Sequence, residues 1–445
     1  MRIVEALRIK LVKRVAFCTF GCRLNAYDTE TVRTLLEKEG GWQTVGLREE
    51  ADLYVVNTCS VTTQADASAR KAIRRINKQR PDARIVVTGC YAQRAPQDIA
   101  ELAGVSLIVG AADRGTIADQ VEASVHGQLK ISVSPIEQAR TFLDVPITEM
   151  MERSRALIKV QEGCDQSCTF CIVPQTRGRS RSRLPERVFS QARGLVDAGY
   201  TEIVLTGVHI GAYGLDLENT DCGLTELIAA VLRTPGLERL RLSSIEPASI
   251  DEELIELMAT EPKFARHFHI PFQSGSNEIL ERMQRGYRAE QFEELVTNIA
   301  GRIPDCGIGT DVIAGFPGES DEHFARTFEV LERLPVTYLH PFTYSVRPGS
   351  TAEAFGDQVS GDVKKRRTRS LKRLSKEKSE EFKNAHLCRT MPVLLELDDK
   401  TNTCPSGWTD NYLKVHVTNP AETPGIYSVH IDSVDDSQTL GTRLS

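Results

Sequence analysis

Residues 155–174 read RALIKVQEGCDQSCTFCIVP, an apolar strand candidate followed at once by Cys164, Cys168 and Cys171. From here to about Phe355, strand candidates alternate with helix candidates. The strand candidates lie at 155–160, 202–208, 239–245, 267–272, 309–316 and 338–344. Such alternation indicates parallel strands covered by helices, and about six units predict a partial (β/α)6 barrel rather than a closed eightfold one.

The flanking regions extend this α/β pattern on one side and end it on the other. Towards the amino terminus, helix candidates separate apolar runs at 14–18, 52–59, 83–90 and 106–111, which predicts a doubly wound parallel sheet. Beyond a charged helix at 360–385, short alternating runs predict a small β-barrel; they lie at 393–399, 412–417 and 427–433. We therefore expect three domains, at 12–128, 150–385 and 386–445.

The composition limits the class of protein. A chain of 445 residues, 26% charged and with a net charge of −6, is typical of a multidomain globular protein that is not basic throughout. No apolar run approaches the length of a membrane span, and residues 1–14 lack the apolar core of a secretory signal. We expect a cytoplasmic monomer with no membrane partner. In such a chain 11 cysteines favour metal ligation or redox work over disulfides.

The central cysteines, Cys164, Cys168 and Cys171, stand at intervals of four and three on one loop. Three thiolates do not complete a tetrahedral zinc site unless a fourth ligand comes from elsewhere. A cubane iron–sulfur cluster held by three thiolates keeps one iron open, which S-adenosylmethionine can chelate through its amino and carboxylate groups. Phe170 precedes the third cysteine, and this segment resembles the cluster loop of radical S-adenosylmethionine (SAM) enzymes, where an aromatic residue usually stands there.

Three more cysteines, Cys22, Cys59 and Cys90, are far apart in the sequence, but each follows its own strand candidate. The carboxyl ends of parallel strands lie along one edge of a sheet, so the three thiols can converge on one cofactor. Gly21 and Gly89 precede two of them and allow a tight turn beside a bulky group. The alternative for each is a small buried hydrophobe. The other cysteines are interpreted as structural: Cys18, Cys222, Cys306, Cys388 and Cys404.

Over nearly its whole length the chain resembles the methylthiotransferase family, which adds CH3S groups to tRNA or to a ribosomal protein. The resemblance rests on FGCRLNAYDTE (20–30), VNTCSVTTQAD (56–66), TGCYAQ (88–93), GCDQSCTFCIVPQTRGRSRSR (163–183), HIPFQSGSNEILERM (269–283), DVIAGFPGES (311–320) and GWTDNYLKV (407–415). It implies an auxiliary [4Fe–4S] cluster on Cys22, Cys59 and Cys90, and a SAM-binding [4Fe–4S] cluster in a radical-SAM barrel on Cys164, Cys168 and Cys171. The last domain resembles the RNA-binding barrel called TRAM.

The resemblance also implies the reaction. One SAM would methylate a sulfur on the auxiliary cluster, and a second would yield the radical that removes hydrogen from an unactivated carbon, work that a cofactor must support. NTCSVTTQAD and RGRSRSR look most like the bacterial branch that modifies C2 of N6-threonylcarbamoyladenosine at tRNA position 37. The same chemistry on N6-isopentenyladenosine 37 or on a ribosomal-protein aspartate is the nearer alternative. A zinc-stabilised RNA-binding protein without catalysis is the distant one.

Other residues are candidates for binding the cofactor. The resemblance implies that His269 and Gln273, together with Phe170, line the SAM pocket, with core packing as the alternative for His269 and Gln273. Gly207 is a further candidate, because a glycine there would let the methionine end of SAM approach the backbone closely. The electron donor is expected to be a flavodoxin or ferredoxin, and the sulfur donor is left open.

A last group of residues consists of candidates for binding tRNA. Those following the cluster loop are Arg177, Arg179, Arg181 and Arg183, with a solvated turn as the alternative. The basic run 364–373 is either a phosphate site or an exposed helix face. The last domain carries four Lys/Arg against eight Asp/Glu, so it would contact RNA by stacking at Trp408 and Tyr412, or contribute little.

Overall fold

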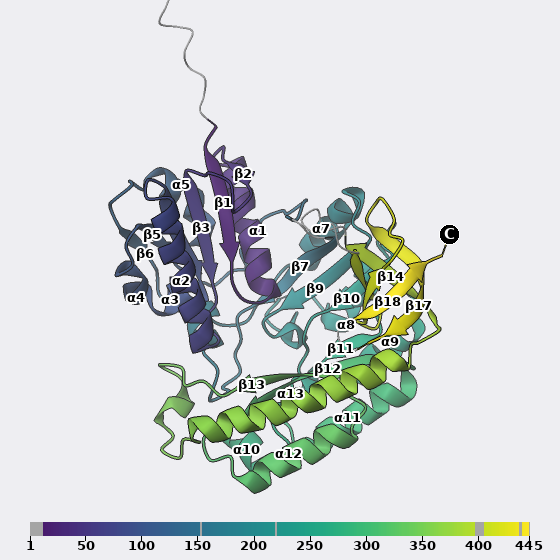
Figure 1. Ribbon diagram of the computed structural model, residues 1–445. Coiled ribbons are helices and arrows are strands. Elements are labelled where there is room, and N and C mark those ends of the chain that lie inside the picture. Colours follow the sequence, from purple (N-terminus) through teal and green to yellow (C-terminus); the bar gives the residue numbers. More distant parts are fainter. Residues whose placement is uncertain (1–11, 152–153, 219, 397–404, 436–437, 445) are drawn as a thin grey trace, which may run out of the picture. The chain divides into compact units, whose positions relative to one another are not determined.

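The computed structural model describes residues 12–151, 154–218, 220–396, 405–435 and 438–444 (Figure 1). The chain forms two compact units. The first unit comprises the described parts of Met1–Ile147 with Gly163–Asp165 and Ile172–Arg179, and the second unit comprises the rest. Cys404 and the end of the run 393–399 lie outside the described residues. The three domain boundaries expected from the sequence stay predictions.

The first unit contains the predicted doubly wound sheet, which is confirmed. Its described strands are all parallel, in the order β2-β1-β3-β4-β5-β6. The strands are β1 (Arg14–Thr19), β2 (Gln43–Val45), β3 (Leu53–Thr58), β4 (Arg84–Gly89), β5 (Val105–Val109) and β6 (Lys130–Ser132). The helices are α1 (Arg23–Lys38), α2 (Thr63–Gln79), α3 (Cys90–Arg94), α4 (Pro96–Ala100), α5 (Ile117–Glu122) and α6 (Val173–Arg177). The strand order reverses between β1 and β3, so the crevice expected to hold ligands lies there.

Both faces of this sheet are apolar, which is why its strands read as continuous hydrophobic runs. In β1, Ala16 and Cys18 belong to the core that α2 covers with Ile73 and Ile76. Burial raises the pKa of Cys18. The structural interpretation of Cys18 fits this position, because a buried neutral thiol packs as a small hydrophobe.

The second unit contains the partial barrel, whose class is confirmed. One sheet has the order β10-β9-β7-β8 and the next has the order β11-β12-β13. An isolated parallel β-bridge pairs Leu240 of β10 with Phe264, which lies just before β11. The strands are β7 (Arg155–Glu162), β8 (Arg181–Ser182), β9 (Glu202–Gly207), β10 (Arg239–Leu242), β11 (His267–His269), β12 (Gly307–Ala314) and β13 (Tyr338–Thr343). The helices are α7 (Pro185–Asp197), α8 (Leu224–Leu232), α9 (Glu252–Thr260), α10 (Asn277–Arg282), α11 (Ala289–Arg302), α12 (Asp321–Arg333) and α13 (Gly361–Asn384). Apart from the short β8, these strands give the predicted six β/α units.

The chain ends in the predicted small barrel, which is closed in the order β14-β15-β16-β18-β17. Its strands are β14 (Thr390–Glu396), β15 (Ser406–Thr409), β16 (Lys414–Val417), β17 (Gly425–Val434) and β18 (Thr439–Arg443). Alternate residues point inward, and Val393, Val415 and Val429 are fully buried among them. In Figure 1 the long helix α13 runs along β13 towards this barrel. Among the described residues, no helix is long and apolar enough to cross a membrane.

The loop between β15 and β16 packs against the amino ends of the larger barrel's strands. Arg241 of β10 donates to the backbone carbonyls of Thr409 (2.8 Å) and Asp410 (2.9 Å). A Cβ on Gly307, the first residue of β12, would lie 2.1 Å from the carbonyl oxygen of Asn411, so glycine is needed for this approach. The small barrel is therefore docked at the end of the larger barrel opposite to the strand ends that carry the cluster loop.

Candidate iron–sulfur and substrate sites

The first candidate site lies where the sheet of the first unit reverses its order. Cys22 precedes α1 just after β1, Cys59 directly follows β3, and Cys90 directly follows β4 as the first residue of α3. All three cysteines therefore lie at carboxyl ends of adjacent strands, on either side of the switch point. The sequence predicted this arrangement from strand ends alone.

Glycines make room beside these thiols. Gly21 has a φ of +110°, and a Cβ there would lie 2.8 Å from the Cβ of Cys59. Gly89 has a φ of +98°, and its Cβ would lie 2.3 Å from the carbonyl oxygen of Thr58. Both conformations disfavour any other residue, so the two turns that present Cys22 and Cys90 depend on glycine.

The three thiols also influence one another. The pKa of the Cys59 thiol is raised to about 11, chiefly by burial and also by the neighbouring thiols of Cys90 and Cys22. The N–H of Val61 and the guanidinium of Arg177 act against this rise. Such a thiol is protonated without a metal, and a metal that binds it must displace the proton. Three convergent thiols fit a [4Fe–4S] cluster that keeps one iron free of protein ligands.

Arg177 belongs to the wall of this site rather than to a surface. Its guanidinium donates to the carboxylate of Asp28 and to the amide oxygen of Asn25, each at 3.0 Å. Asp28 is fully buried and also binds Arg114 at 3.0 Å. A buried carboxylate between two arginines is a stable arrangement only while both partners stay in place.

The second candidate site is the loop between β7 and α6. Cys164 belongs to the first unit, and its N–H donates to the carbonyl of Gly178 at 2.9 Å. Gly163 has a φ of +76°, and a Cβ there would lie 1.8 Å from the carbonyl oxygen of Arg179. The backbone therefore enters the cluster loop through a turn that only glycine allows.

Cys168 and Cys171 belong to the second unit, where a turn joins them through the Cys171 N–H and the Cys168 carbonyl at 3.0 Å. Between them, Thr169 donates through its hydroxyl to the carbonyl of Arg282 at 2.8 Å. Phe170 packs on the apolar cluster that contains Ile279, Met283, Ile313 and Phe316. These contacts give Phe170 an anchoring role, and its predicted contact with the cofactor stays a prediction.

Arg285 was not identified from the sequence. It donates to the sulfur of Cys168 at 3.1 Å, and its other terminal nitrogen is bound by the carboxylate of Glu246. Only 5% of the Arg285 side chain is exposed. A buried cation beside the Cys168 thiol fits an anionic iron–sulfur cluster bound by that sulfur. No pattern within the sequence pairs residues 246 and 285 with the cysteine loop.

The structure supports a cofactor role for Gln273 better than it does for Gly207. A Cβ on Gly207 would lie 3.1 Å from side-chain atoms of Gln161, so packing against Gln161 already explains this glycine. Gln273 has a φ of +64° and is 8% exposed, and its side-chain oxygen has no hydrogen-bond partner among the described residues. A strained backbone with an unpaired buried acceptor indicates a ligand contact. Both cofactor roles stay predictions.

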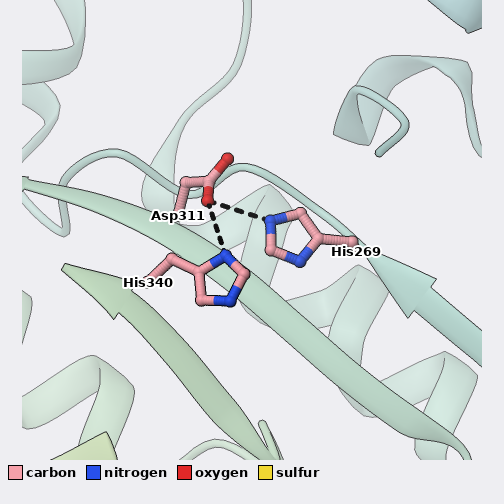
Figure 2. Close-up of side chains that lie close together, drawn as sticks. All are labelled: His269, Asp311 and His340. Carbon is pink, nitrogen blue, oxygen red and sulfur yellow. Dashed lines mark hydrogen bonds and ion pairs between the residues drawn. The ribbon is translucent and has the colours of Figure 1, made fainter. Parts of the chain in front are cut away.

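His269 belongs to a cluster that the sequence did not reveal (Figure 2). Its Nε2 lies 2.9 Å from Oδ1 of Asp311, and Nδ1 of His340 lies 3.5 Å from the same oxygen. Tyr338 reaches Nδ1 of His269 with its hydroxyl at 3.2 Å. The one signal available in the sequence was a carboxylate within the apolar run 309–316, where a charge needs a partner. We call His269, Asp311 and His340 the His–Asp–His cluster.

The structure narrows the candidates for RNA contact. Arg177, Arg181 and Arg183 are buried, whereas Arg179 is exposed. A phosphate needs a guanidinium that faces solvent, so the expected contact is corrected to Arg179 alone, where it stays a prediction. In the basic run, the cations that face solvent are Lys365, Arg366, Arg369, Lys372 and Arg373.

Trp408 and Tyr412 are half-buried and stack on each other with ring centroids 4.4 Å apart. The Arg155 guanidinium lies 5.6 Å from the Trp408 ring, and His267 stacks on Tyr412 at 4.3 Å. These partners pack on the ring faces of Trp408 and Tyr412. Base stacking here therefore stays a prediction that the ring packing does not support.

Comparison with known proteins places both sites in a family context. Residues 14–110 match the family described as "Uncharacterized protein family UPF0004", and residues 158–331 match the "Radical SAM superfamily". The chain is 40% identical to "Threonylcarbamoyladenosine tRNA methylthiotransferase MtaB" of Bacillus subtilis (strain 168), over 90% of this chain and 89% of the relative. It is 38% identical to the protein of the same name from Aquifex aeolicus (strain VF5), over 90% and 96%.

Relatives with another printed substrate are also similar. The chain is 34% identical to "tRNA-2-methylthio-N(6)-dimethylallyladenosine synthase" of Aliarcobacter butzleri (strain RM4018), over 96% of this chain and 97% of the relative. Among solved structures, the radical SAM methyltransferase TsrM of Kitasatospora setae superimposes with a TM-score of 0.55 at 17% identity, over 75% of each chain. That similarity shows the shared fold alone.

Proposed function

This chain belongs to the methylthiotransferase family of radical SAM enzymes, and we propose that it methylthiolates C2 of N6-threonylcarbamoyladenosine at position 37 of tRNA. The observation that carries the proposal is the pairing of two cysteine sites, one at three strand ends and one on a single loop, in one chain. The relatives named for this nucleoside support the choice of substrate.

Each site would hold one [4Fe–4S] cluster. Cys164, Cys168 and Cys171 would hold the cluster that binds SAM. Cys22, Cys59 and Cys90 would hold the auxiliary cluster. When bound, these groups supply the reductive radical chemistry and the sulfur transfer that an unactivated C–H bond requires. Glu246 holds the guanidinium of Arg285 in place, so that its positive charge lies against the sulfur of Cys168.

The tRNA is the proposed partner, and the exposed cations of α13 are the best surface for its phosphates. Lys365, Arg369 and Lys372 follow helical spacing and are exposed. Position 37 is unpaired in the anticodon loop, so the base edge is accessible without opening a duplex. We propose that the enzyme works in the cytoplasm as a monomer, with electrons from a flavodoxin or ferredoxin.

Mass analysis of tRNA nucleosides tests this function. A deletion strain should lose 2-methylthio-N6-threonylcarbamoyladenosine, and the gene for the intact chain should restore it. Cys168→Ala and Cys59→Ala should fail to restore it, whereas Cys222→Ser, a thiol outside both sites, should succeed. Persistence of the nucleoside in the deletion strain would reject the proposed substrate.

The Aliarcobacter relative makes N6-isopentenyladenosine 37 the second candidate substrate. The same nucleoside analysis separates the two, because loss of only the methylthiolated isopentenyl nucleoside would favour it. Protein purified without oxygen should carry about eight irons per chain if two [4Fe–4S] clusters are present. Colourless protein with stoichiometric zinc would instead indicate the non-catalytic alternative.

A further inference from the structure

The His–Asp–His cluster lies on three adjacent parallel strands of the second unit. His269 pairs in register with Gly309, and Asp311 pairs with His340 across β12 and β13. Figure 2 shows the three side chains pointing towards one another above this sheet. Asp311 stands three residues before the end of β12 at Ala314, about 10 Å from the carboxyl rim of the barrel. The His–Asp–His cluster therefore lines the inside of the barrel, below the rim where radical SAM chemistry is expected.

Hydrogen bonds fix the orientation of this cluster. Burial alone would raise the pKa of Asp311, but hydrogen bonds with His269 and His340 outweigh it and hold that pKa below its ordinary value. The carboxylate is therefore ionised and accepts from both rings. Tyr338 occupies the second nitrogen of His269 at 3.2 Å, so both nitrogens of that ring are used within the protein.

His340 differs from His269 because, among the described residues, only one of its ring nitrogens pairs with another side chain. Nδ1 of His340 faces Asp311, which directs Nε2 away from the carboxylate. The His340 side chain is 53% exposed, whereas that of His269 is only 8% exposed. With Nδ1 turned to Asp311, Nε2 is the ring nitrogen that can hydrogen-bond a ligand.

The surroundings of His340 are cationic and aromatic. A cavity of about 310 Å³ is lined by His340, Tyr338, Lys383 and Lys414 together with Thr337, Ser379, Phe382, Trp408, Tyr412 and Leu413. No carboxylate belongs to this described lining. Groups that donate hydrogen bonds and carry positive charge favour an anionic, hydrogen-bonding ligand.

We propose that this cavity recognises the polar end of the substrate's N6 substituent, with Lys383 and Lys414 binding its carboxylate and His340, held by Asp311, hydrogen-bonding its hydroxyl. The inference rests on the proposed function and deepens it. A threonylcarbamoyl group ends in a carboxylate and a hydroxyl, which match these groups. An isopentenyl group would displace water from the imidazole and the lysines but offer them no hydrogen bonds in return. Leaving these polar groups unpaired is costly. The His–Asp–His cluster and its cavity thus select the polar nucleoside over the apolar one.

Binding of short RNA hairpins tests the inference without turnover. Anticodon stem-loops carrying threonylcarbamoyladenosine, isopentenyladenosine or unmodified adenosine at position 37 are titrated into anaerobic holoenzyme, with affinity measured by fluorescence anisotropy. His340→Ala should weaken binding of the threonylcarbamoyl hairpin by up to about tenfold, as loss of one hydrogen bond predicts. Its affinity for the unmodified hairpin should stay unchanged. His340→Gln, which keeps a neutral hydrogen-bonding group, should restore part of the loss.

Two controls separate the possible failures. Leu387→Ala changes an exposed side chain outside the cavity lining and should leave all three affinities unchanged. If wild-type holoenzyme methylthiolates only the isopentenyl hairpin, the proposed function itself fails. If wild type acts on the threonylcarbamoyl hairpin but His340→Ala binds every hairpin with unchanged or equally reduced affinity, the inference alone is overturned.

A bound cation is the competing use of this cluster. The three ligand atoms lie within 4.8 Å of one another, a spacing that a divalent metal could bridge. Elemental analysis of the holoenzyme decides the point. Zinc, manganese or non-cluster iron at one equivalent in the wild type, absent from His340→Ala, would overturn recognition by the imidazole. Equal metal content in the two proteins is the result we expect.

Discussion

Arg241 of β10 donates from Nε to Oε1 of Glu202, the first residue of the neighbouring strand β9, at 3.0 Å, and both side chains are fully buried. Arg239 binds the other oxygen of the same carboxylate at 3.1 Å. Arg239 also donates from Nη1 to the carbonyl of Trp408, and Arg241 donates from Nη2 to the carbonyl of Thr409, so both arginines hold the backbone of the small barrel. A single carboxylate therefore fixes the two guanidinium groups that dock one barrel on the other.

Replacing Glu202 by Gln should destabilise the second unit strongly. The substitution leaves two buried guanidinium groups without their anion, at a cost of about 3–5 kcal/mol. Chemical denaturation followed by circular dichroism measures the change. Glu238→Gln, an exposed glutamate beside β10, is the matched control and should change the free energy of unfolding by less than about 0.5 kcal/mol.

The same carboxylate predicts a pH dependence. Burial would raise the pKa of Glu202, but Arg241 and Arg239 outweigh it and lower that pKa in the folded protein. The stabilisation is therefore fully present above the unfolded pKa of about 4.3, and it is lost as pH falls through the lower folded value. Melting temperatures between pH 3 and pH 6 should fall more steeply for wild type than for Glu202→Gln. Parallel curves would contradict this account.

Arg285 should tune the cluster on the cysteine loop. A hydrogen bond to a ligating sulfur stabilises the reduced, more negative cluster and raises its reduction potential. Arg285→Gln should therefore shift the potential to more negative values, measured by redox titration with EPR detection. Arg282→Gln, three residues away and paired with exposed Asp357, should leave the potential unchanged.

Gly89 should be irreplaceable next to the auxiliary site. Gly89→Ala places a Cβ 2.3 Å from a carbonyl oxygen in addition to the strain of a φ of +98°. Gly127 has a φ of +78° with nothing within 4 Å, so Gly127→Ala carries the backbone strain alone, about 1–2 kcal/mol. We expect a larger loss of stability for Gly89→Ala, together with about half the iron per chain. Equal losses in the two variants would count against the steric explanation.

The exposed cations of α13 should govern the salt dependence of tRNA binding. Substituting Lys365, Arg369 and Lys372 by Ala should weaken binding across tRNA sequences and reduce the slope of log affinity against log salt by about three. Filter binding between 50 and 200 mM salt, concentrations over which such contacts weaken strongly, measures the slope. Arg233→Ala, an exposed cation after α8, serves as the comparison. An unchanged slope in the triple variant would remove α13 from the RNA surface.

The sequence alone determined the fold class and indicated two candidate cysteine sites. Candidate ligands on one loop are marked by local spacing, so Cys164, Cys168 and Cys171 could be proposed without coordinates. Cys22, Cys59 and Cys90 followed from a topological rule, because parallel strands bring their carboxyl ends to one edge. Both inferences need only periodicity and order along the chain.

Only the tertiary structure decided which charged groups are free to act. Arg177 looked like a phosphate ligand until Asp28, far earlier in the chain, was found to bind it. Asp311 and His340 meet because β12 and β13 pair in one particular register, and a shift of one residue would point them to opposite faces. Register and burial depend on packing between distant segments, and the local patterns that locate cysteines at strand ends carry no information about either.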